Sequence, residues 1–270
     1  MWLLLKIAIA ALCACAIIVL VAYFAQRKLI YFPDPTRVLP AQLGLAGVEE
    51  RILKTPDGER LVAWYAKARP GEPTLLYFHG NGGGLRDRVE RIGRFMGEGW
   101  GVYMLAYRGY SGSTGTPTEV ANVADARLAY GALRLEGVAA EATIAYGESL
   151  GSHIAARIAV ERQVGGLILE APYTSVAQLG RQLYPYLPVD WLLLDRYETD
   201  KVIAQLKVPI LILHGARDRT IPLAMGRELA RLANEPKHLV VFPNAGHNNL
   251  YVDGNEALPV VRDWIRSLAR

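Results

Sequence analysis

The chain has 270 residues, of which 51% are hydrophobic and 21% charged, and its net charge is +4. The Lys and Arg residues are scattered, without a basic run or a basic-aromatic stripe, which argues against a nucleic-acid-binding protein. Both cysteines, Cys13 and Cys15, lie in an apolar N-terminal run. The rest of the chain, about 240 residues, therefore has no disulfide framework, thiol nucleophile or Cys-based metal site, and it is long enough for one large α/β domain.

The N-terminal run is a candidate membrane anchor. Residues 7–25 carry no charge, and at helical rise such a run comes close to spanning a bilayer core. We predict a transmembrane helix within an anchor of residues 1–28. A cleaved signal peptide is the alternative, but it would have a shorter apolar core and a small-residue cleavage site. Basic residues after the run outnumber Lys6 before it, which slightly favours a cytoplasmic location for the rest of the chain.

The remainder, residues 29–270, is expected to form one domain. A Pro-containing connector over 29–48 leads to two antiparallel strands around the Pro56-Asp57-Gly58 turn. Apolar strands are then predicted at 74–78, 102–106, 143–146, 167–169, 210–213 and 239–242, with helices at 85–97, 118–136, 153–161, 223–233 and 256–268. Strands buried on both faces and joined through helices indicate an α/β fold with a mainly parallel sheet.

One strand-to-helix junction carries the pattern of a nucleophile elbow. Residues 147–151 read Gly-Glu-Ser-Leu-Gly, between a short apolar strand and a helical run, as G-x-S-x-G requires. Gly147 and Gly151 would let the chain reverse tightly and present Ser149 above the sheet edge. The Leu150 amide would point the same way as a donor to an oxyanion. The alternative is an ordinary Gly-Ser turn in a βα unit.

A glycine-rich loop at residues 77–84 follows an earlier strand. Its sequence, Tyr-Phe-His-Gly-Asn-Gly-Gly-Gly, allows close approach to a substrate carbonyl, and the Asn81 amide is the expected partner of the Leu150 amide in an oxyanion hole. A phosphate-binding loop is the alternative, but the ending and spacing of such loops are absent. His79 is either a base or, as we prefer, a residue that holds the loop by hydrogen bonds.

An acid and a base are expected after the last two strands. Asp218 follows the strand at 210–213 closely, whereas the other candidate acids, Asp195, Asp200 and Asp253, do not follow a strand so closely. A helix cap or a surface ion pair is the alternative role for Asp218.

His247 follows the last strand in a Gly-containing loop. Of the other histidines, His153 is expected to pack inside its helix, His214 to brace the acid's loop and His238 to be exposed. The resulting chain order of serine, aspartate and histidine is that of α/β-hydrolases.

These motifs together resemble the α/β-hydrolase superfamily. The matching segments are 147–151, His79-Gly-Asn81, His214-Gly-x-x-Asp218-x-x-x-Pro222, Gly246-His247, residues 107–119 and the post-anchor segment 26–33. The chain is most similar to the membrane-anchored "α/β-hydrolase domain" branch, related to the serine aminopeptidase-like hydrolases. The resemblance implies a central eight-stranded sheet, helices on both faces, no metal and no organic cofactor.

Residues 172–208 join two strands and are expected to form a short cap over the site. The cap is rich in apolar and aromatic residues, which favours an acyl chain over a sugar or phosphate. The residues predicted to line the substrate pocket are Tyr173, Tyr184, Tyr186 and Trp191.

The sequence therefore predicts a serine hydrolase that cleaves esters or thioesters of lipid-like acyl groups through Ser149, His247 and Asp218. An aminopeptidase is the first alternative; it would need an acidic group to hold a substrate amino terminus, and Glu148 or Glu170 could serve. A non-catalytic, membrane-tethered binding module is the second alternative. The expected partners are a small-molecule or lipid acyl ester and a membrane, without nucleic acid or metal.

Overall fold

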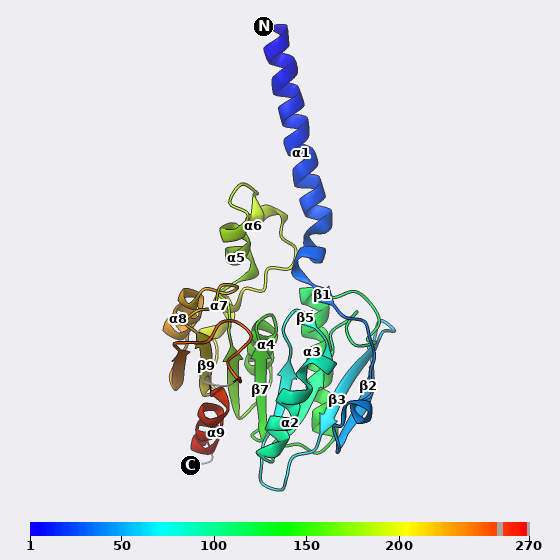
Figure 1. Cartoon of the computed structure of the whole chain (residues 1–270), viewed down its shortest axis with the longest axis vertical. Coiled ribbons are helices and arrows are strands. Elements are labelled where there is room, and N and C mark those ends of the chain that lie inside the picture. Colours follow the sequence, from blue (N-terminus) through cyan, green and yellow to red (C-terminus); the bar gives the residue numbers. More distant parts are fainter. Residues whose placement is uncertain (253–255, 269–270) are drawn as a thin grey trace.

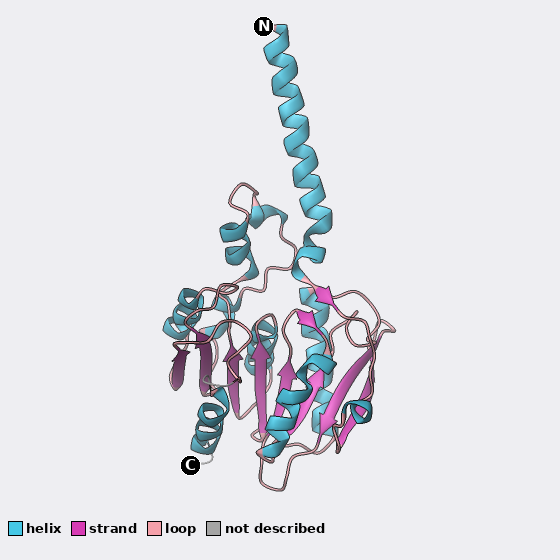
Figure 2. Ribbon diagram, in the orientation of Figure 1, coloured by secondary structure: helices cyan, strands magenta, loops and turns pink. Residues whose placement is uncertain are grey.

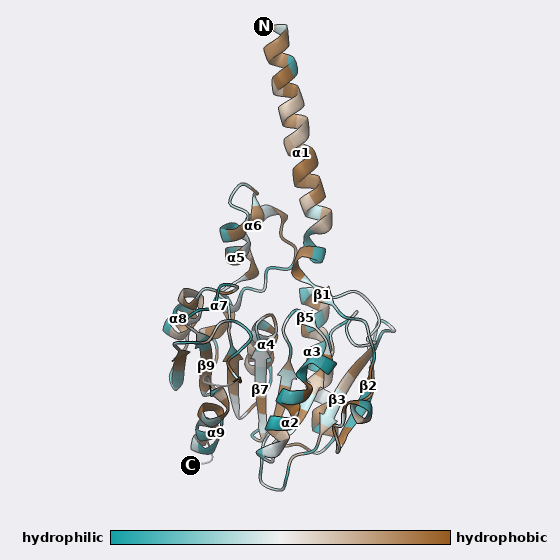
Figure 3. Cartoon of the chain, in the orientation of Figure 1, coloured by the Kyte–Doolittle hydropathy of each residue, from teal (hydrophilic) through white to brown (hydrophobic). Residues whose placement is uncertain are grey.

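A single long helix projects from an otherwise rounded body (Figure 1). The computed structural model describes residues 1–252 and 256–268. Helix α1 (Trp2–Ile30) contains 29 residues, and its composition and length suffice to cross a membrane. It is apolar over most of its length (Figure 3), and most of its residues are exposed. The helix extends two residues past the predicted anchor boundary.

The body is built on one twisted sheet with the order β10-β9-β8-β7-β4-β6-β3-β2. Its strands are β2 (Val48–Lys54), β3 (Arg60–Ala66), β4 (Thr74–Phe78), β6 (Gly101–Leu105), β7 (Thr143–Glu148), β8 (Gly166–Glu170), β9 (Ile210–Gly215) and β10 (Lys237–Phe242). The six strands from β10 to β6 run parallel, and β3 and β2 are antiparallel to their neighbours. The predicted eight-stranded, mainly parallel sheet is confirmed.

Helices cover both faces of this sheet (Figure 2), α2 in front and α3 and α4 behind. The main ones are α2 (Val89–Gly97), preceded by the 3₁₀ turn η2 (Leu85–Arg88), α3 (Glu119–Leu135), α4 (Gly151–Glu161), α8 (Leu223–Leu232) and α9 (Ala257–Leu268). All five correspond to predicted helices. The strands between them are fully buried in β4, β6 and β8, as expected for a sheet packed on both faces.

The cap follows β8 and stands beside the lower part of α1 (Figure 1). It contains α5 (Val176–Leu183) and α6 (Val189–Leu192). The next helix, α7 (Thr199–Ile203), packs against α4 and belongs to the body. Only the earlier part of residues 172–208 therefore rises above the sheet.

The connector after α1 is fastened to the glycine-rich loop. Strand β1 (Phe32–Pro33) pairs in parallel with β5 (Gly82–Gly83), and the 3₁₀ turn η1 (Pro40–Leu43) follows. Ile30 and Tyr31 are buried, so the start of the connector packs on the body. The two-stranded ladder was not predicted, because two residues carry no periodicity.

Candidate active site

Ser149 lies at the sharp turn between β7 and α4, with a positive φ of 49°. A non-glycine residue adopts this conformation only where its surroundings enforce it. A Cβ on Gly147 would lie 2.5 Å from the Gly151 carbonyl oxygen, and a Cβ on Gly151 would overlap the Phe78 carbonyl. Both glycines are therefore required by close backbone approach, as the G-x-S-x-G pattern predicts.

Three side chains from different loops form a continuous hydrogen-bonded chain. The Ser149 hydroxyl donates to Nε2 of His247 at 3.0 Å, and Nδ1 of His247 donates to Oδ2 of Asp218 at 2.7 Å. Asp218 follows β9 and His247 follows β10, so all three groups meet at the carboxyl edge of the parallel strands. The structure thus brings together the three residues that the sequence selected.

The Asp218 side chain is fully buried but well supported as an anion. Its Oδ1 accepts hydrogen bonds from the amides of Thr220 and Ile221, both at 2.8 Å. Burial alone would raise the pKa of Asp218, but the bond from His247 and these two amides lower it below its ordinary value. His214 donates to the Ile221 carbonyl at 2.9 Å, which confirms that it braces this loop.

The Asn81 peptide is oriented by contacts on every side except its amide. Its side chain donates to the Ile30 carbonyl at 2.7 Å, and its own carbonyl accepts from the Tyr110 hydroxyl at 2.7 Å. Among the described residues, neither the Asn81 amide nor the Leu150 amide donates to a protein acceptor. Both residues line the cavity beside Ser149, so both amides suit an oxyanion, the role that we propose for them.

His79 is not part of the hydrogen-bonded chain. It is completely buried, its Nδ1 donates to the Gly80 carbonyl at 2.6 Å, and its ring lies 4.2 Å from that of Tyr107. Burial lowers the pKa of His79 to about 3, so the ring is neutral. It holds the glycine-rich loop, in agreement with the preferred prediction.

An apolar cavity of about 190 Å³ opens on one side of Ser149. It is bounded by Ser149 and its neighbour, by the cap, and by the last turns of α1. Its lining residues are Ala22, Gln26, Leu29, Ile30, Asn81, Ser149, Leu150, Tyr173, Val176, Leu179, Gly180, Leu183, Tyr184, Leu187, Val189, Leu192, Leu193, Thr220 and Ile221. The four residues of α1 were not predicted as part of the site.

Two of the four predicted pocket residues line this cavity and two do not. Tyr173 and Tyr184 do. Tyr186 and Trp191 are 97% and 91% exposed, so their assignment to the pocket is wrong. In α6, Val189 and its i+3 neighbour share the face toward the cavity, which turns Trp191 outward.

A second, polar cavity of about 440 Å³ lies on the other side of Ser149. It shares Asn81, Ser149 and Thr220 with the first cavity. Its further lining residues are Gly80, Gly82, Asp87, Arg88, Arg91, Glu148, His247 and Asn248. The hydroxyl of Ser149 is therefore at the boundary between an apolar and a polar compartment.

The two glutamates considered for binding an amino terminus are already paired. Arg88 donates to Glu148 at 2.9 Å and 3.3 Å, and Arg91 donates to Glu170 at 2.5 Å. Burial would raise the pKa of Glu148, but Arg88 and Arg91 lower it well below its ordinary value. Glu148 also accepts a bond from Tyr77, and Glu170, which is 1% exposed, accepts one from Tyr146, so both carboxylates are engaged within the protein.

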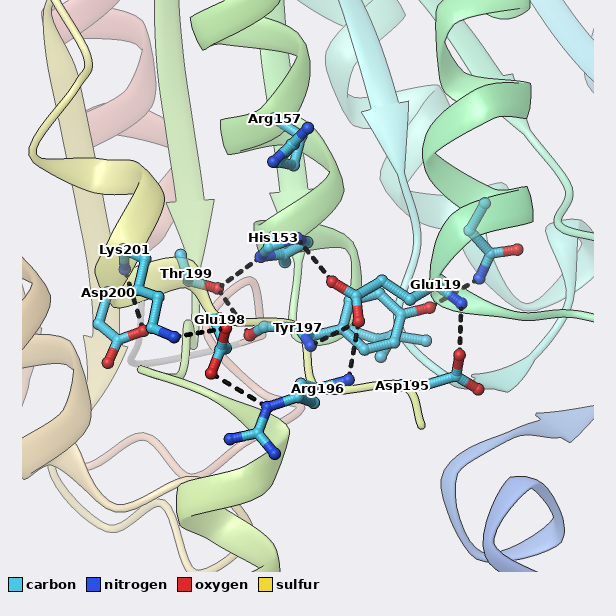
Figure 4. Close-up of polar contacts among 12 residues, drawn as sticks. Glu119, His153, Arg157, Asp195, Arg196, Tyr197, Glu198, Thr199, Asp200 and Lys201 are labelled. Atoms are coloured by element: carbon cyan, nitrogen blue, oxygen red, sulfur yellow. Dashed lines mark hydrogen bonds and ion pairs between the residues drawn. The ribbon is translucent and has the colours of Figure 1, made fainter. Parts of the chain in front are cut away.

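The other candidate acids lie outside the site. Asp195 accepts from the Glu119 amide at 3.0 Å, in a polar cluster at the base of the cap (Figure 4). Asp200, in the first turn of α7, accepts from the Lys201 amide at 3.0 Å. Asp253 lies outside the described residues.

Known proteins are similar to this chain in sequence and in fold. The family model described as "Serine aminopeptidase, S33" matches residues 70–195. The α/β hydrolase domain-containing protein WAV2 of Arabidopsis thaliana is 30% identical over 260 residues, 86% of this chain and 84% of that protein. The chain belongs to the α/β-hydrolase family. This membership supports its assignment as a hydrolase.

Other similarities extend over most of this hydrolase. The uncharacterized protein Rv2307c of Mycobacterium tuberculosis is 38% identical over 267 residues, 97% of this chain and 95% of its own. The lysophosphatidylserine lipase ABHD12 of Danio rerio is 29% identical over 234 residues, 76% of this chain and 61% of its own. The Pyrococcus furiosus esterase Pf2001 shares the fold, with a TM-score of 0.64 at 18% identity over 88% of this chain and 95% of that one.

Proposed function

We propose that this protein is a serine hydrolase that cleaves carboxylic esters or thioesters of lipid-like acyl groups. The observation that carries the proposal is the chain of hydrogen bonds from Ser149 through His247 to Asp218, together with the position of Ser149 at a cavity lined mostly by apolar side chains. An acyl chain fits the apolar side, and a polar leaving group fits the opposite cavity. The Danio rerio relative, which is named a lysophosphatidylserine lipase, supports this division.

The reaction follows from the orientation of the three side chains. Ser149 Oγ attacks the substrate carbonyl carbon while its proton passes to Nε2 of His247. The developing oxyanion is held by the Asn81 and Leu150 amides. His247 then returns the proton to the departing alcohol or thiol, which leaves an acyl-serine. Water repeats the sequence, with its proton again taken by His247, and releases the carboxylic acid.

Asp218 orients His247 for each of these proton transfers. Its carboxylate accepts from Nδ1 of His247, which fixes the tautomer whose Nε2 is free to accept the serine proton. Because the lowered pKa keeps Asp218 ionised, it also stabilises the imidazolium that forms during each transfer.

The aminopeptidase alternative has less support. Binding a substrate amino terminus needs an acidic group with free acceptor oxygens near Ser149, whereas Glu148 and Glu170 are held by Arg88 and Arg91. The binding-module alternative has less support too, since a non-catalytic protein would not require the strained φ at Ser149. We further propose that α1 anchors the hydrolase in a membrane, where lipid esters are concentrated.

The first test is the Ser149→Ala variant of the detergent-solubilised protein. We expect turnover of nitrophenyl esters to fall by about four orders of magnitude or more, because the nucleophile is lost while the fold is kept. Ser267→Ala, the same change at an exposed position on α9, is the matched control and should keep wild-type rates. Hydrolysis by Ser149→Ala within tenfold of the wild type would contradict the proposed function.

A further inference from the structure

The anchor helix forms part of the wall around the nucleophile. Ala22, Gln26, Leu29 and Ile30 of α1 border the same cavity as Ser149. Ala22 belongs to the uncharged run 7–25, the part of α1 that suits a hydrocarbon layer. The cavity thus connects the nucleophile with the membrane-compatible portion of the helix. A helix that served only as a tether would need no such contact.

Gln26 joins α1 to the cap. Its side-chain amide donates to the Leu192 carbonyl at 3.0 Å, and its side-chain oxygen accepts from the Leu194 amide at 2.7 Å. One turn of cap backbone is thereby clamped to the helix. Gln26 is only 7% exposed, although most of α1 is exposed. A polar side chain with both ends satisfied in this position fixes the distance between the two apolar walls.

The end of α1 also reaches the groups that act on the substrate carbonyl. The Asn81 side chain donates to the Ile30 carbonyl at 2.7 Å, and the Phe32 amide donates to the Asn81 carbonyl at 3.2 Å. The proposed oxyanion donor is therefore held between two residues at the base of the helix.

A second connection runs from α1 to the helix that begins after Ser149. Arg27 donates to Asp195 at 3.1 Å, and Asp195 accepts from the Glu119 amide at 3.0 Å. Glu119 contacts His153 of α4 at 3.3 Å (Figure 4). Burial would raise the pKa of Glu119, but the bonds from His153 and from the Tyr197 amide lower it, so the cluster retains its carboxylate.

We propose that α1 forms one wall of the acyl-binding site and contacts the bound acyl chain. Gln26 is a positioning residue that holds the cap against this helix. The acyl chain then reaches Ser149 along α1, directly from the hydrocarbon layer. This inference rests on the function proposed above and adds the substrate class: a membrane-resident amphiphile whose acyl chain enters the cavity beside α1.

The free energy of lipid transfer favours this route. Moving an acyl chain from a bilayer into water is unfavourable for every methylene that it exposes, and a cavity continuous with α1 avoids that step. The rim of the cap fits the same environment. Leu183 is 63% exposed, Tyr184 44% and Trp191 91%, and aromatic residues of this kind favour the membrane interface.

Ala22→Trp tests the wall. The indole would fill the cavity from the α1 side, so the ratio of kcat/KM for nitrophenyl laurate to that for nitrophenyl butyrate should fall by at least about tenfold, as expected when several buried methylenes lose their site. Ala16→Trp is the matched control: the same change on the same helix, at an exposed position outside the cavity. It should keep the wild-type ratio.

Gln26→Leu tests the clamp without adding bulk. It removes both bonds to the cap but keeps the side-chain size, so the long-chain KM should rise about tenfold while kcat changes much less. Labelling of Ser149 by a fluorophosphonate at the wild-type rate verifies that each variant is folded. If Ala22→Trp fails to label, the KM of Gln26→Leu decides the question.

The outcomes separate this inference from the proposed function. An unchanged chain-length ratio in Ala22→Trp, or a parallel fall for both esters, would overturn the role of α1, as would an unchanged long-chain KM in Gln26→Leu. The proposed function would still stand if Ser149→Ala were inactive. Hydrolysis that survives in Ser149→Ala would instead remove the function itself.

Discussion

The two cavities that meet at Ser149 are built in opposite ways. The apolar one is enclosed by α1 and the cap, the two elements that rise from the sheet (Figure 1), and several of its lining side chains are half exposed. The polar one lies over the sheet itself, and its arginines are fixed by ion pairs with Glu148 and Glu170. The apolar wall is thus held mainly by apolar contacts, whereas the second wall, the ion-paired wall, is held by bonds between charged groups.

This difference indicates which part of a substrate each cavity selects. Apolar contacts are non-directional, so under the proposed function the α1 side would accept acyl chains of several lengths. Charged hydrogen bonds are directional, and leaving one unmade is costly, so the polar side would discriminate between leaving groups by their hydrogen-bonding pattern. Chemistry at the boundary should be common to all substrates.

Asp218→Asn should show the largest effect and should affect every substrate alike. An amide at this position favours the wrong tautomer of His247, so kcat should fall by about 10⁴-fold for short and long esters equally. Steady-state rates over an acyl series would measure this. Asp200→Asn, a change at another candidate acid, is the control and should stay within about twofold of the wild type. A larger loss in Asp200→Asn than in Asp218→Asn would refute the triad.

Arg91→Met should show how much the stability of the ion-paired wall of the polar cavity depends on charge pairing. Arg91 bonds Glu170 at 2.5 Å and lies 4.5 Å from the centre of the Tyr251 ring. Removing it leaves Glu170, which is 1% exposed, without its cation, so the free energy of unfolding should fall by about 3 kcal/mol. Urea denaturation of the solubilised protein would measure this.

Two comparisons make that result specific. Adding Glu170→Gln to Arg91→Met removes the orphaned charge and should recover at least half of the loss, whereas no recovery would contradict the ion-pair explanation. On the wall of the apolar cavity, Leu183→Ala should lower the free energy of unfolding by less than about 0.5 kcal/mol, because surface substitutions of this kind have small effects. Equal costs on the two walls would remove the distinction between them.

The meeting of Ser149, Asp218 and His247 at one edge of the sheet was predictable because each residue has a local signature. A buried parallel strand is readable from its apolar run, and functional groups in such sheets lie just past the carboxyl ends of strands. Ser149 had two flanking glycines, and Asp218 and His247 each followed one of the last two strands. The sheet and its five main helices were predictable for the same reason, since each has a long periodic segment.

The walls of the cavities were not predictable in this way. The Gln26–Leu192 bond joins residues 166 positions apart, and a contact of that range leaves no local pattern. Trp191 was misassigned because α6 has only four residues, too few to show which face is buried. Arg88 and Arg91 would be expected on a solvated helix face, and only the fold reveals that Glu148 and Glu170 draw them inward.

The loop shared by both cavities should make the hydrolase sensitive to acid through His79. Its pKa is about 3 in the folded protein, against about 6.5 in an unfolded chain. Between these values the unfolded state binds a proton that the folded state does not, so stability falls as pH falls. From pH 7 to pH 5 the protonation of this group alone should lower the free energy of unfolding by about 2 kcal/mol.

His79→Gln should lose correspondingly less stability than the wild type over that interval, as measured by urea denaturation at each pH. His238→Gln, a change at an exposed histidine, should keep the wild-type dependence. If His79→Gln kept the wild-type dependence too, the buried neutral ring would not be a source of acid sensitivity.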